Sequence, residues 1–189
     1  MHAWQQRQDL RARQFTCGYC GRLVASDKGY GTSNSPAGAV HICPNCSKPS
    51  YFYDHDTLQV PGVVPGNEVA ALPNDVNRLY REARRCVSVN ANTAAVLACR
   101  KLLMNIAVSQ GAAPGESFVS YVEYLANNGF VPPNGRGWVD HIRRKGNEAT
   151  HEILLMTAED ANELILFAEM LLKFIFEFPS RVPPQGAAN

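Results

Sequence analysis

The stretch CGYC at residues 17–20 is followed, after 22 further residues, by CPNC at residues 43–46. These are two Cys-x-x-Cys pairs, and each pair can place two thiolates on one side of a metal ion. Zinc prefers four such soft ligands at tetrahedral corners, and four thiolates leave no open position for water or substrate. The pattern therefore predicts a structural Zn²⁺ site, rather than a catalytic or redox site, with the ligands Cys17, Cys20, Cys43 and Cys46.

The residues around the two pairs favour a small zinc ribbon over positions 15–58. Between the pairs Gly, Ser, Thr and Asn are frequent, which indicates a short β-hairpin and a loop, with strands at 23–24 and 40–42. His41 and His55 are alternative metal ligands, although ordinary packing or surface positions suit both of them.

Aromatic and basic side chains gather in the same region of the sequence. They could form a binding face for nucleic acid, or they could only pack and solvate the ribbon, and the residue pattern leaves both readings open. The side chains concerned are Tyr19, Lys28, Tyr30, Lys48, Tyr51 and Tyr53.

The composition of the whole chain of 189 residues is that of a globular protein. Hydrophobic residues make up 46% and charged residues 19%, which allows a sizeable core. The net charge of +1 creates no global field toward nucleic acid or membrane, so any anion site must be local. No apolar run could cross a bilayer, and residues 1–14 lack an apolar signal core. We therefore expect a soluble, cytoplasmic protein with no membrane partner, whose six cysteines are metal ligands or buried thiols.

Proline and glycine mark the predicted domain boundaries. Residues 59–73 are rich in both, and proline lacks the amide that helices and sheets need, so we predict an extended linker that can lie on the following domain. Residues 1–14 form an N-terminal arm, and residues 179–189, with three prolines, form a flexible tail. The domain between linker and tail covers residues 74–178.

Helical spacing dominates this domain, because apolar residues recur at intervals of three and four. Asn74 is the predicted N-cap of its first helix. The helix expected over 93–109 is apolar on most sides and should be the buried central one. The last and longest helix is expected over 158–178, opened by a capping box of Thr157 and Asp160. We predict a four- to five-helix bundle, and for the whole chain a mainly α fold with a small β-hairpin in the zinc ribbon.

The most polar and cationic stretch of the helical domain is HIRRKGNEATHE at residues 141–152. Gly146 and Asn147 interrupt the helical pattern in its middle, which indicates a kink or a break. On an unbroken helix Arg144 and His151 would share one face about 10 Å apart, and a kink would bring them closer. We therefore expect a guanidinium group and an imidazole to face a common cavity.

This stretch resembles the motif of HEPN ribonucleases, in which an arginine is followed, after four to six residues, by a histidine. Residues 72–179 also resemble a bacterial domain-of-unknown-function family that is placed with HEPN and is found fused to type I restriction subunits. The sequences that carry this resemblance are DVxxLYxEAR at 75–84, RKLL at 100–103 and GNEATHE at 146–152.

The resemblance implies a HEPN-like bundle and metal-independent RNA cleavage, in which the 2′-hydroxyl attacks the adjacent phosphate and a cyclic phosphate results. His151 would be the general acid or base, Arg144 would hold the phosphate, and Asn147 would add a polar group. The resemblance also implies a homodimer, with RNA and a protein of a bacterial defence or toxin system as partners. Further candidate phosphate or RNA contacts are Arg143, Lys145 and His141.

Lys145 departs from the HEPN motif, because active members usually have Asn, Asp or His directly after the arginine. The departure bears on catalysis more than on fold, since many HEPN domains only bind or dimerise. From the residues alone a structural role also stays open, in which His151 and Arg144 bond to Glu148 or Glu152. The second reading is thus a non-catalytic interaction or dimerisation module that docks a restriction or toxin–antitoxin subunit.

Overall fold

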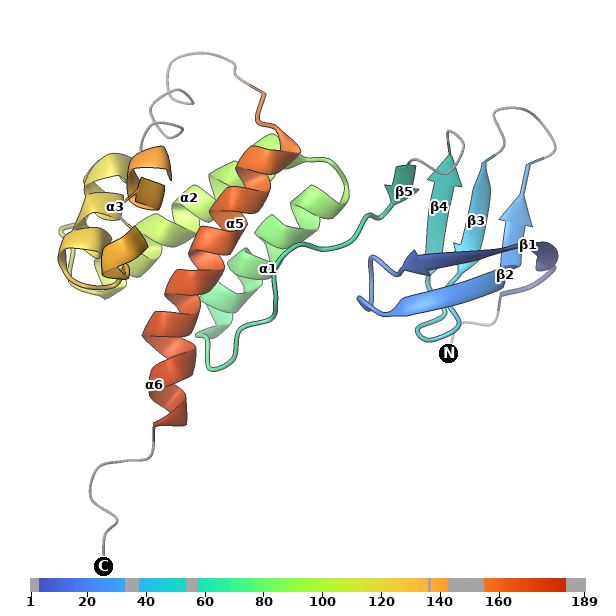
Figure 1. Cartoon of the computed structure of the whole chain (residues 1–189), viewed down its shortest axis with the longest axis horizontal. Coiled ribbons are helices and arrows are strands. Elements are labelled where there is room, and N and C mark those ends of the chain that lie inside the picture. The colour runs from blue at the N-terminus through green and yellow to red at the C-terminus, as the bar shows by residue number, and fades with distance from the viewer. Residues whose placement is uncertain (1–3, 33–37, 54–57, 136, 143–154, 183–189) are drawn as a thin grey trace, which may run out of the picture. The chain divides into compact units, whose positions relative to one another are not determined.

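The structure is a computed structural model, which describes residues 4–32, 38–53, 58–135, 137–142 and 155–182 (Figure 1). The contacts divide the chain into two compact units, residues 1–64 and residues 65–189. We call them the sheet unit and the helical unit, and describe each by itself. Within the described ranges, no helix is both long and apolar enough to span a membrane.

The sheet unit is built on a five-stranded antiparallel sheet, whose strands are neighbours in chain order (Figure 1). The strands are β1 Gln8–Thr16, β2 Leu23–Gly31, β3 Ala39–Ile42, β4 Pro49–Tyr53 and β5 Leu58–Val60. The predicted short hairpin is therefore wrong, and so is the mainly α class for the whole chain. The predicted strand at 23–24 is only the beginning of a strand of nine residues.

The sequence did not predict the full length of these strands, because their residues alternate poorly between apolar and polar. β1 reads QDLRARQFT, and Phe15 is its one buried side chain. Its extended form depends on pairing with β2, where Phe15 lies opposite Val24. Strand formation of this kind is decided by neighbouring strands rather than by the strand's own residues, so the local pattern did not predict it.

The buried face of β2 changes partway along the strand. Ser26 is buried, the next two residues Asp27 and Lys28 are both exposed, and Gly29 is buried again. Two successive exposed residues shift the alternation of an extended strand by one position. In the same region the sheet bends, so that β1 and the first half of β2 run across the direction of β3 and β4 (Figure 1).

A small aromatic core lies within the sheet unit. Phe15 and Phe52 pack edge to face with their ring centroids 5.0 Å apart, and the His41 ring lies beside both. The buried apolar residues of this cluster are Phe15, Cys17, Cys43 and Phe52. Because so few apolar side chains are buried here, we expect the cysteines to supply much of this unit's stability.

The helical unit packs around one long central helix. Its described elements are α1 Asn74–Ser88, α2 Asn92–Ser109, α3 Phe118–Asn127, the 3-10 turn η1 Pro133–Gly135, α5 Ala158–Leu172, the π-helical segment η2 Lys173–Glu177 and α6 Phe178–Arg181. Residues 137–142 are helical as well. Helix α2 contacts α1, α3 and α5 and completely buries Leu102, Leu103 and Ile106, which confirms its predicted central place.

N-terminal caps were predicted for two helices, α1 and α5. The capping box is confirmed, because the Asp160 amide donates to Thr157 Oγ1 at 3.1 Å and the Thr157 amide donates to Asp160 Oδ2 at 2.9 Å. Asn74 is not an N-cap: α1 begins at Asn74 itself, after Pro73, without a side-chain cap. Proline suits this place since the first amides of a helix have no intrahelical partner.

Residues 65–70, within the predicted linker, lie along the helical unit, and we call them the strap. The buried Arg84 of α1 donates to the carbonyl oxygens of Pro65 and Gly66 at 2.7 and 2.9 Å, and to Glu68 Oε1 at 2.7 Å. Gly66 adopts φ +68°, and a Cβ there would lie 2.8 Å from an oxygen of Glu169. Glycine is therefore required for both the backbone conformation and the close approach.

Two buried carboxylates on the last helix bind the other side of the strap. Glu169 accepts the Asn67 amide at 2.8 Å and the Asn67 side chain at 3.0 Å, and Glu177 accepts the Ala70 amide at 3.1 Å. Tyr80 donates to the Asn67 carbonyl oxygen at 3.0 Å. The strap thus satisfies its backbone with side chains of α1, α5 and η2, which is what burial of such groups requires.

The π-helical segment η2 brings these two carboxylates onto one face. In a regular α-helix, side chains eight residues apart, such as Glu169 and Glu177, would point about 80° apart. A π turn takes up roughly one extra residue without extra rotation, which reduces the difference to about 20°. Pro179 favours the distortion, because its ring would clash with the carbonyl group of Ile175, four residues earlier in η2.

Candidate functional site

Four cysteine sulfurs converge in the sheet unit. The Sγ atoms of Cys17, Cys20, Cys43 and Cys46 all lie within 4.8 Å of one another. Cys17 Sγ is 3.7 Å from Cys46 Sγ, and Cys20 Sγ is 3.8 Å from Cys43 Sγ. A tetrahedral ion with metal–sulfur distances of about 2.3 Å has edges of roughly 3.8 Å between its ligands. Since a disulfide is only about 2.05 Å long, the spacing fits a shared metal ion.

Each cysteine pair lies in the same kind of turn. One turn connects β1 to β2 and the other connects β3 to β4, and both have the same two backbone hydrogen bonds. The bonds are Cys17 N to Arg22 O at 3.0 Å, Gly21 N to Cys17 O at 2.8 Å, Cys43 N to Lys48 O at 2.9 Å and Ser47 N to Cys43 O at 2.9 Å. The residue after the second cysteine has a positive φ in each turn, +67° at Gly21 and +58° at Ser47. This repetition aims two pairs of sulfurs at one centre.

Gly18 lets the first turn pack against the end of β5. A Cβ at this position would lie 2.4 Å from the carbonyl oxygens of both Pro61 and Gly62, closer than any side chain can approach. The Gln59 side chain reinforces the approach, because it donates to the carbonyl oxygens of Thr16 at 2.8 Å and Pro61 at 3.0 Å. The last strand therefore helps to hold the cysteine turn in place.

Crowding and hydrogen bonding set the acidity of the sulfurs. Burial raises the pKa of Cys46, and the three neighbouring thiols raise it further, to about 12. Burial also raises the pKa of Cys20, but hydrogen bonds with the Arg22 backbone and with Asn45 outweigh it and lower the pKa to about 7. Four thiolates this close together repel one another, so a doubly charged cation at their centre suits the donor set.

The histidines do not extend this cluster in the part of the sheet unit that the structure describes. His41 Nδ1 lies 3.1 Å from the Ser26 carbonyl oxygen, and burial lowers the pKa of His41. Its ring belongs to the aromatic core with Phe15 and Phe52. His55 lies outside the described residues.

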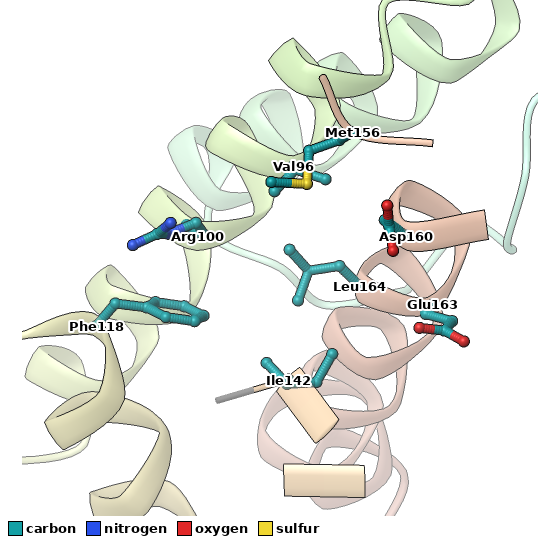
Figure 2. Close-up of a pocket in the computed structure, with 8 residues that line it drawn as sticks. All are labelled: Val96, Arg100, Phe118, Ile142, Met156, Asp160, Glu163 and Leu164. Atoms are coloured by element: carbon teal, nitrogen blue, oxygen red, sulfur yellow. The ribbon is translucent and has the colours of Figure 1, made fainter. Parts of the chain in front are cut away.

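A small pocket lies in the helical unit. Arg100 and Phe118 lie on one side, while Asp160 and Glu163 of α5 lie on the other (Figure 2). The Arg100 guanidinium is 4.6 Å from the centre of the Phe118 ring, and burial lowers the pKa of Arg100. The remaining lining residues are Val96, Ile142, Met156 and Leu164, so the wall between the charged groups is apolar.

The predicted catalytic and binding residues are placed only in part. Of this group, His141 is described: its Nε2 lies 2.7 Å from Glu163 Oε2, which joins the helical residues 137–142 to α5. Lying outside the described residues are Arg143, Arg144, Lys145, Asn147 and His151. Their proposed arrangement therefore stays a prediction.

The sequence did not predict that two carboxylates, those of Asp160 and Glu163, lie beside Arg100 and His141. Glu163 is 22 residues from His141, and no periodic pattern links the two. Asp160 was predicted only as part of a capping box, yet it also lines the pocket. The capping box predicted the start of the helix but not the pocket, which depends on packing between α2, α3, α5 and the helical residues 137–142.

Fold and site together define a class of protein: a four-cysteine sheet unit, compatible with a bound metal ion, followed by a helical domain. The helical part gives the family. Residues 81–186 match the family described as Domain of unknown function (DUF4145), which is more than half of the chain, and the chain belongs to that family. The match agrees with the resemblance to a domain-of-unknown-function family. No curated protein and no solved structure matches the chain.

Proposed function

We propose that this protein is a HEPN-like module that binds RNA and cleaves it without a catalytic metal ion, and whose four cysteines hold a structural Zn²⁺. The observation that carries the proposal is where the segment with the predicted motif is attached. Ile142 and Met156, on either side of it, both line the pocket that contains Arg100 (Figure 2). The predicted motif is thus flanked on both sides by residues of one pocket, which contains the Arg100 guanidinium, a group that binds phosphate, as well as the carboxylates of Asp160 and Glu163.

In this proposal the two motif residues divide the chemistry. As the 2′-oxygen attacks phosphorus, the bond from phosphorus to the 5′-oxygen breaks. His151 either takes the proton from the 2′-hydroxyl or gives one to the leaving 5′-oxygen, and water exchanges the other proton, because an imidazole titrates near neutral pH. Arg144 binds the phosphate and stabilises the added charge of the transition state. The metal takes no part, since four thiolates fill its coordination sphere. The resemblance of residues 141–152 to the HEPN motif supports the proposal.

We expect the intact protein to cleave mixed single-stranded RNA in a buffer with EDTA, and to leave cyclic phosphate ends. His151→Ala is expected to lower the rate by about 100-fold or more, because a positioned general acid or base typically contributes this much. Gel assays of end-labelled RNA measure both quantities. Metal analysis after the reaction checks that the chelator has not emptied the cysteine site.

His55→Ala, which changes a histidine outside the motif, is the matched control and should cleave like the original protein. Cleavage that disappears in EDTA while the cysteine site keeps its metal would contradict the proposal. So would full activity of the His151→Ala variant.

An exposed apolar stripe supports a second candidate function, that of a non-catalytic dimerisation module. Leu166, Met170, Phe174 and Phe178 repeat at intervals of four along α5, η2 and α6. Leu166 is 50%, Phe174 47% and Phe178 45% exposed, and the two phenylalanine rings are in contact. Contiguous apolar surface of this kind marks an interaction site. We propose a second copy of the chain as its partner, with a defence-system protein as a further partner of the dimer.

We expect sedimentation of the original protein to give twice the chain mass, and Phe174→Glu to give the mass of one chain. A glutamate on the stripe would bury unpaired charge in the dimer. Val108→Glu is the control, since Val108 is 39% exposed on α2, outside the stripe, and its variant should remain dimeric. A monomeric original protein would exclude this contact. A dimer that does not cleave RNA would favour the second function over the first.

A further inference from the structure

Two tyrosines on β4 form an exposed pair of parallel rings. Tyr51 and Tyr53 are stacked, with ring centroids 5.6 Å apart and an angle of 12° between their planes. They are 41% and 38% exposed, although each could bury a large apolar area. Phe52 between them is buried in the aromatic core, since successive side chains of a strand point to opposite faces. We call Tyr51 and Tyr53 the tyrosine pair.

The strand register places the tyrosine pair on an apolar outer face of the sheet. Tyr51 lies opposite Val40 of β3 and Val60 of β5, and Val40 lies opposite Tyr30 of β2. Directly opposite residues of antiparallel strands share a face. Side chains from four neighbouring strands, β2 to β5, therefore form a row across the outer face. Tyr53 lies on the same face, two residues further along β4.

The tyrosine pair is held in place before any ligand arrives. The Tyr51 ring lies against Gly38, where a Cβ would be 2.5 Å from the Tyr51 hydroxyl oxygen. Since Tyr53 stacks on Tyr51, each ring limits the movement of the other. A surface that needs no ordering on binding retains more of the contact energy as affinity.

Charge in the chain is divided unequally between its two units. Residues 1–64 contain six Arg and Lys against four Asp and Glu, an excess of +2, whereas residues 65–189 contain 12 against 13, a balance of −1. The sheet unit therefore carries all of the chain's positive excess. An aromatic face on a cationic unit complements a ligand with flat rings and negative charge.

We propose that the tyrosine pair binds single-stranded RNA, with unpaired bases stacked on its rings and the phosphates attracted by the net positive charge of the sheet unit. The inference rests on the proposed RNA function and deepens it, because it assigns the place where the strand is held. A single strand suits the face better than a duplex, whose bases are already stacked on one another.

The test uses the full-length His151→Ala protein with its metal, so that RNA is not degraded while binding is measured by fluorescence anisotropy of a labelled 12-nucleotide strand. We expect Tyr51→Ala and Tyr53→Ala together to weaken binding by about tenfold for each ring removed. Tyr51→Phe with Tyr53→Phe keeps both rings and should retain the original affinity. Circular dichroism and metal content show whether every variant keeps its sheet.

A titration over several salt concentrations separates stacking from phosphate contact. The slope of log affinity against log salt should be the same with and without the two rings, because only ionic contacts release counterions. Equal binding of a duplex of the same sequence would overturn the proposal, and so would unchanged affinity of a folded double-alanine variant. If the tyrosine pair binds a peptide and does not bind RNA, the proposal is equally wrong.

Binding and cleavage can fail independently of each other. A protein that binds through the tyrosine pair but never cleaves RNA would uphold this inference and refute the nuclease. If cleavage depends on His151 but RNA affinity does not change when the tyrosine pair is removed, the nuclease proposal is upheld and this inference is refuted.

Discussion

Replacement of Cys17 and Cys20 by serine is expected to release the metal ion and unfold the sheet unit, while the helical unit stays folded. Protein purified without added zinc should contain about one equivalent of Zn²⁺, and the double variant none. The expected loss is large, because structural zinc contributes roughly 10 kcal/mol or more of apparent folding free energy in small domains. Elemental analysis measures the metal, and the amide resonances of residues 8–60 report on the sheet.

The size of this effect follows from the small core of the sheet unit. Its buried apolar cluster holds Phe15 and Phe52 together with the two buried cysteines, and the partly buried members are Cys20, Val24 and Cys46. The four cysteines thus make up much of this cluster. If the cluster holds a metal ion as predicted, removing two of them removes the metal and the link between the β1–β2 turn and the β3–β4 turn at the same time.

Cys86→Ser is the matched control for this experiment. Cys86 is also a free, half-buried cysteine, but it lies on α1 and belongs to no described metal cluster. Its variant should keep one equivalent of zinc and a folded sheet. Retention of a full equivalent by the Cys17→Ser, Cys20→Ser protein would disprove the assignment of the ligands.

Glu169→Ala is expected to destabilise the helical unit by about 3 kcal/mol, because it leaves buried partners unpaired. Glu169 accepts both nitrogens of Asn67 and pairs with Lys173. Burial beside Glu169 raises the pKa of Tyr80, so the phenol stays protonated and its hydroxyl lies 3.4 Å from that carboxylate. Without the carboxylate, the Asn67 amide keeps its place in the strap but loses its acceptor. Urea unfolding followed by helical circular dichroism measures the change.

The same carboxylate should make stability depend on pH in the acid range. Burial by itself raises the pKa of Glu169, but hydrogen bonds from Lys173 and Asn67 outweigh it and lower the pKa below the ordinary 4.5. A lowered pKa in the folded state means that the stabilisation is complete above about pH 4.5 and is lost as the pH falls through the folded value. Glu169→Gln removes the charge, so its unfolding free energy should lack this part of the acid decline.

Glu163→Gln offers the contrast on the same helix. Its carboxylate is 44% exposed and pairs with His141, whose side chain is 35% exposed, and pairs so accessible to water contribute at most about 1 kcal/mol. We expect a small change in unfolding free energy. An equal loss in both glutamate variants would show that the strap does not hold the helical unit together.

The strap also decides where the helical unit begins. The family match begins at residue 81, but the contacts that satisfy Arg84 and Glu169 begin at Pro65. Since each of these charged groups is buried, a chain that starts later leaves them without their partners. A shortened protein with the complete helical unit therefore has to start at or before Pro65.

The sequence by itself determined the features that depend on short intervals along the chain. Two Cys-x-x-Cys pairs predicted the sulfur cluster, because each turn is closed by bonds between residues four or five apart. Apolar spacing predicted α2 and α5, and the pair Thr157 and Asp160 predicted the start of α5, since a helix satisfies its backbone locally. The family resemblance rested on the same kind of local pattern.

Only the tertiary structure decided the features that join distant residues. β1 became a strand by pairing with β2, which its polar sequence did not predict. The bond between Asn67 and Glu169 spans 102 residues, and the pocket needed α2, α3, α5 and the helical residues 137–142 to pack together. The physical reason is that helices and tight turns are stabilised by near neighbours in sequence, whereas sheets, buried ion pairs and cavities are stabilised by partners that only the folded chain brings close.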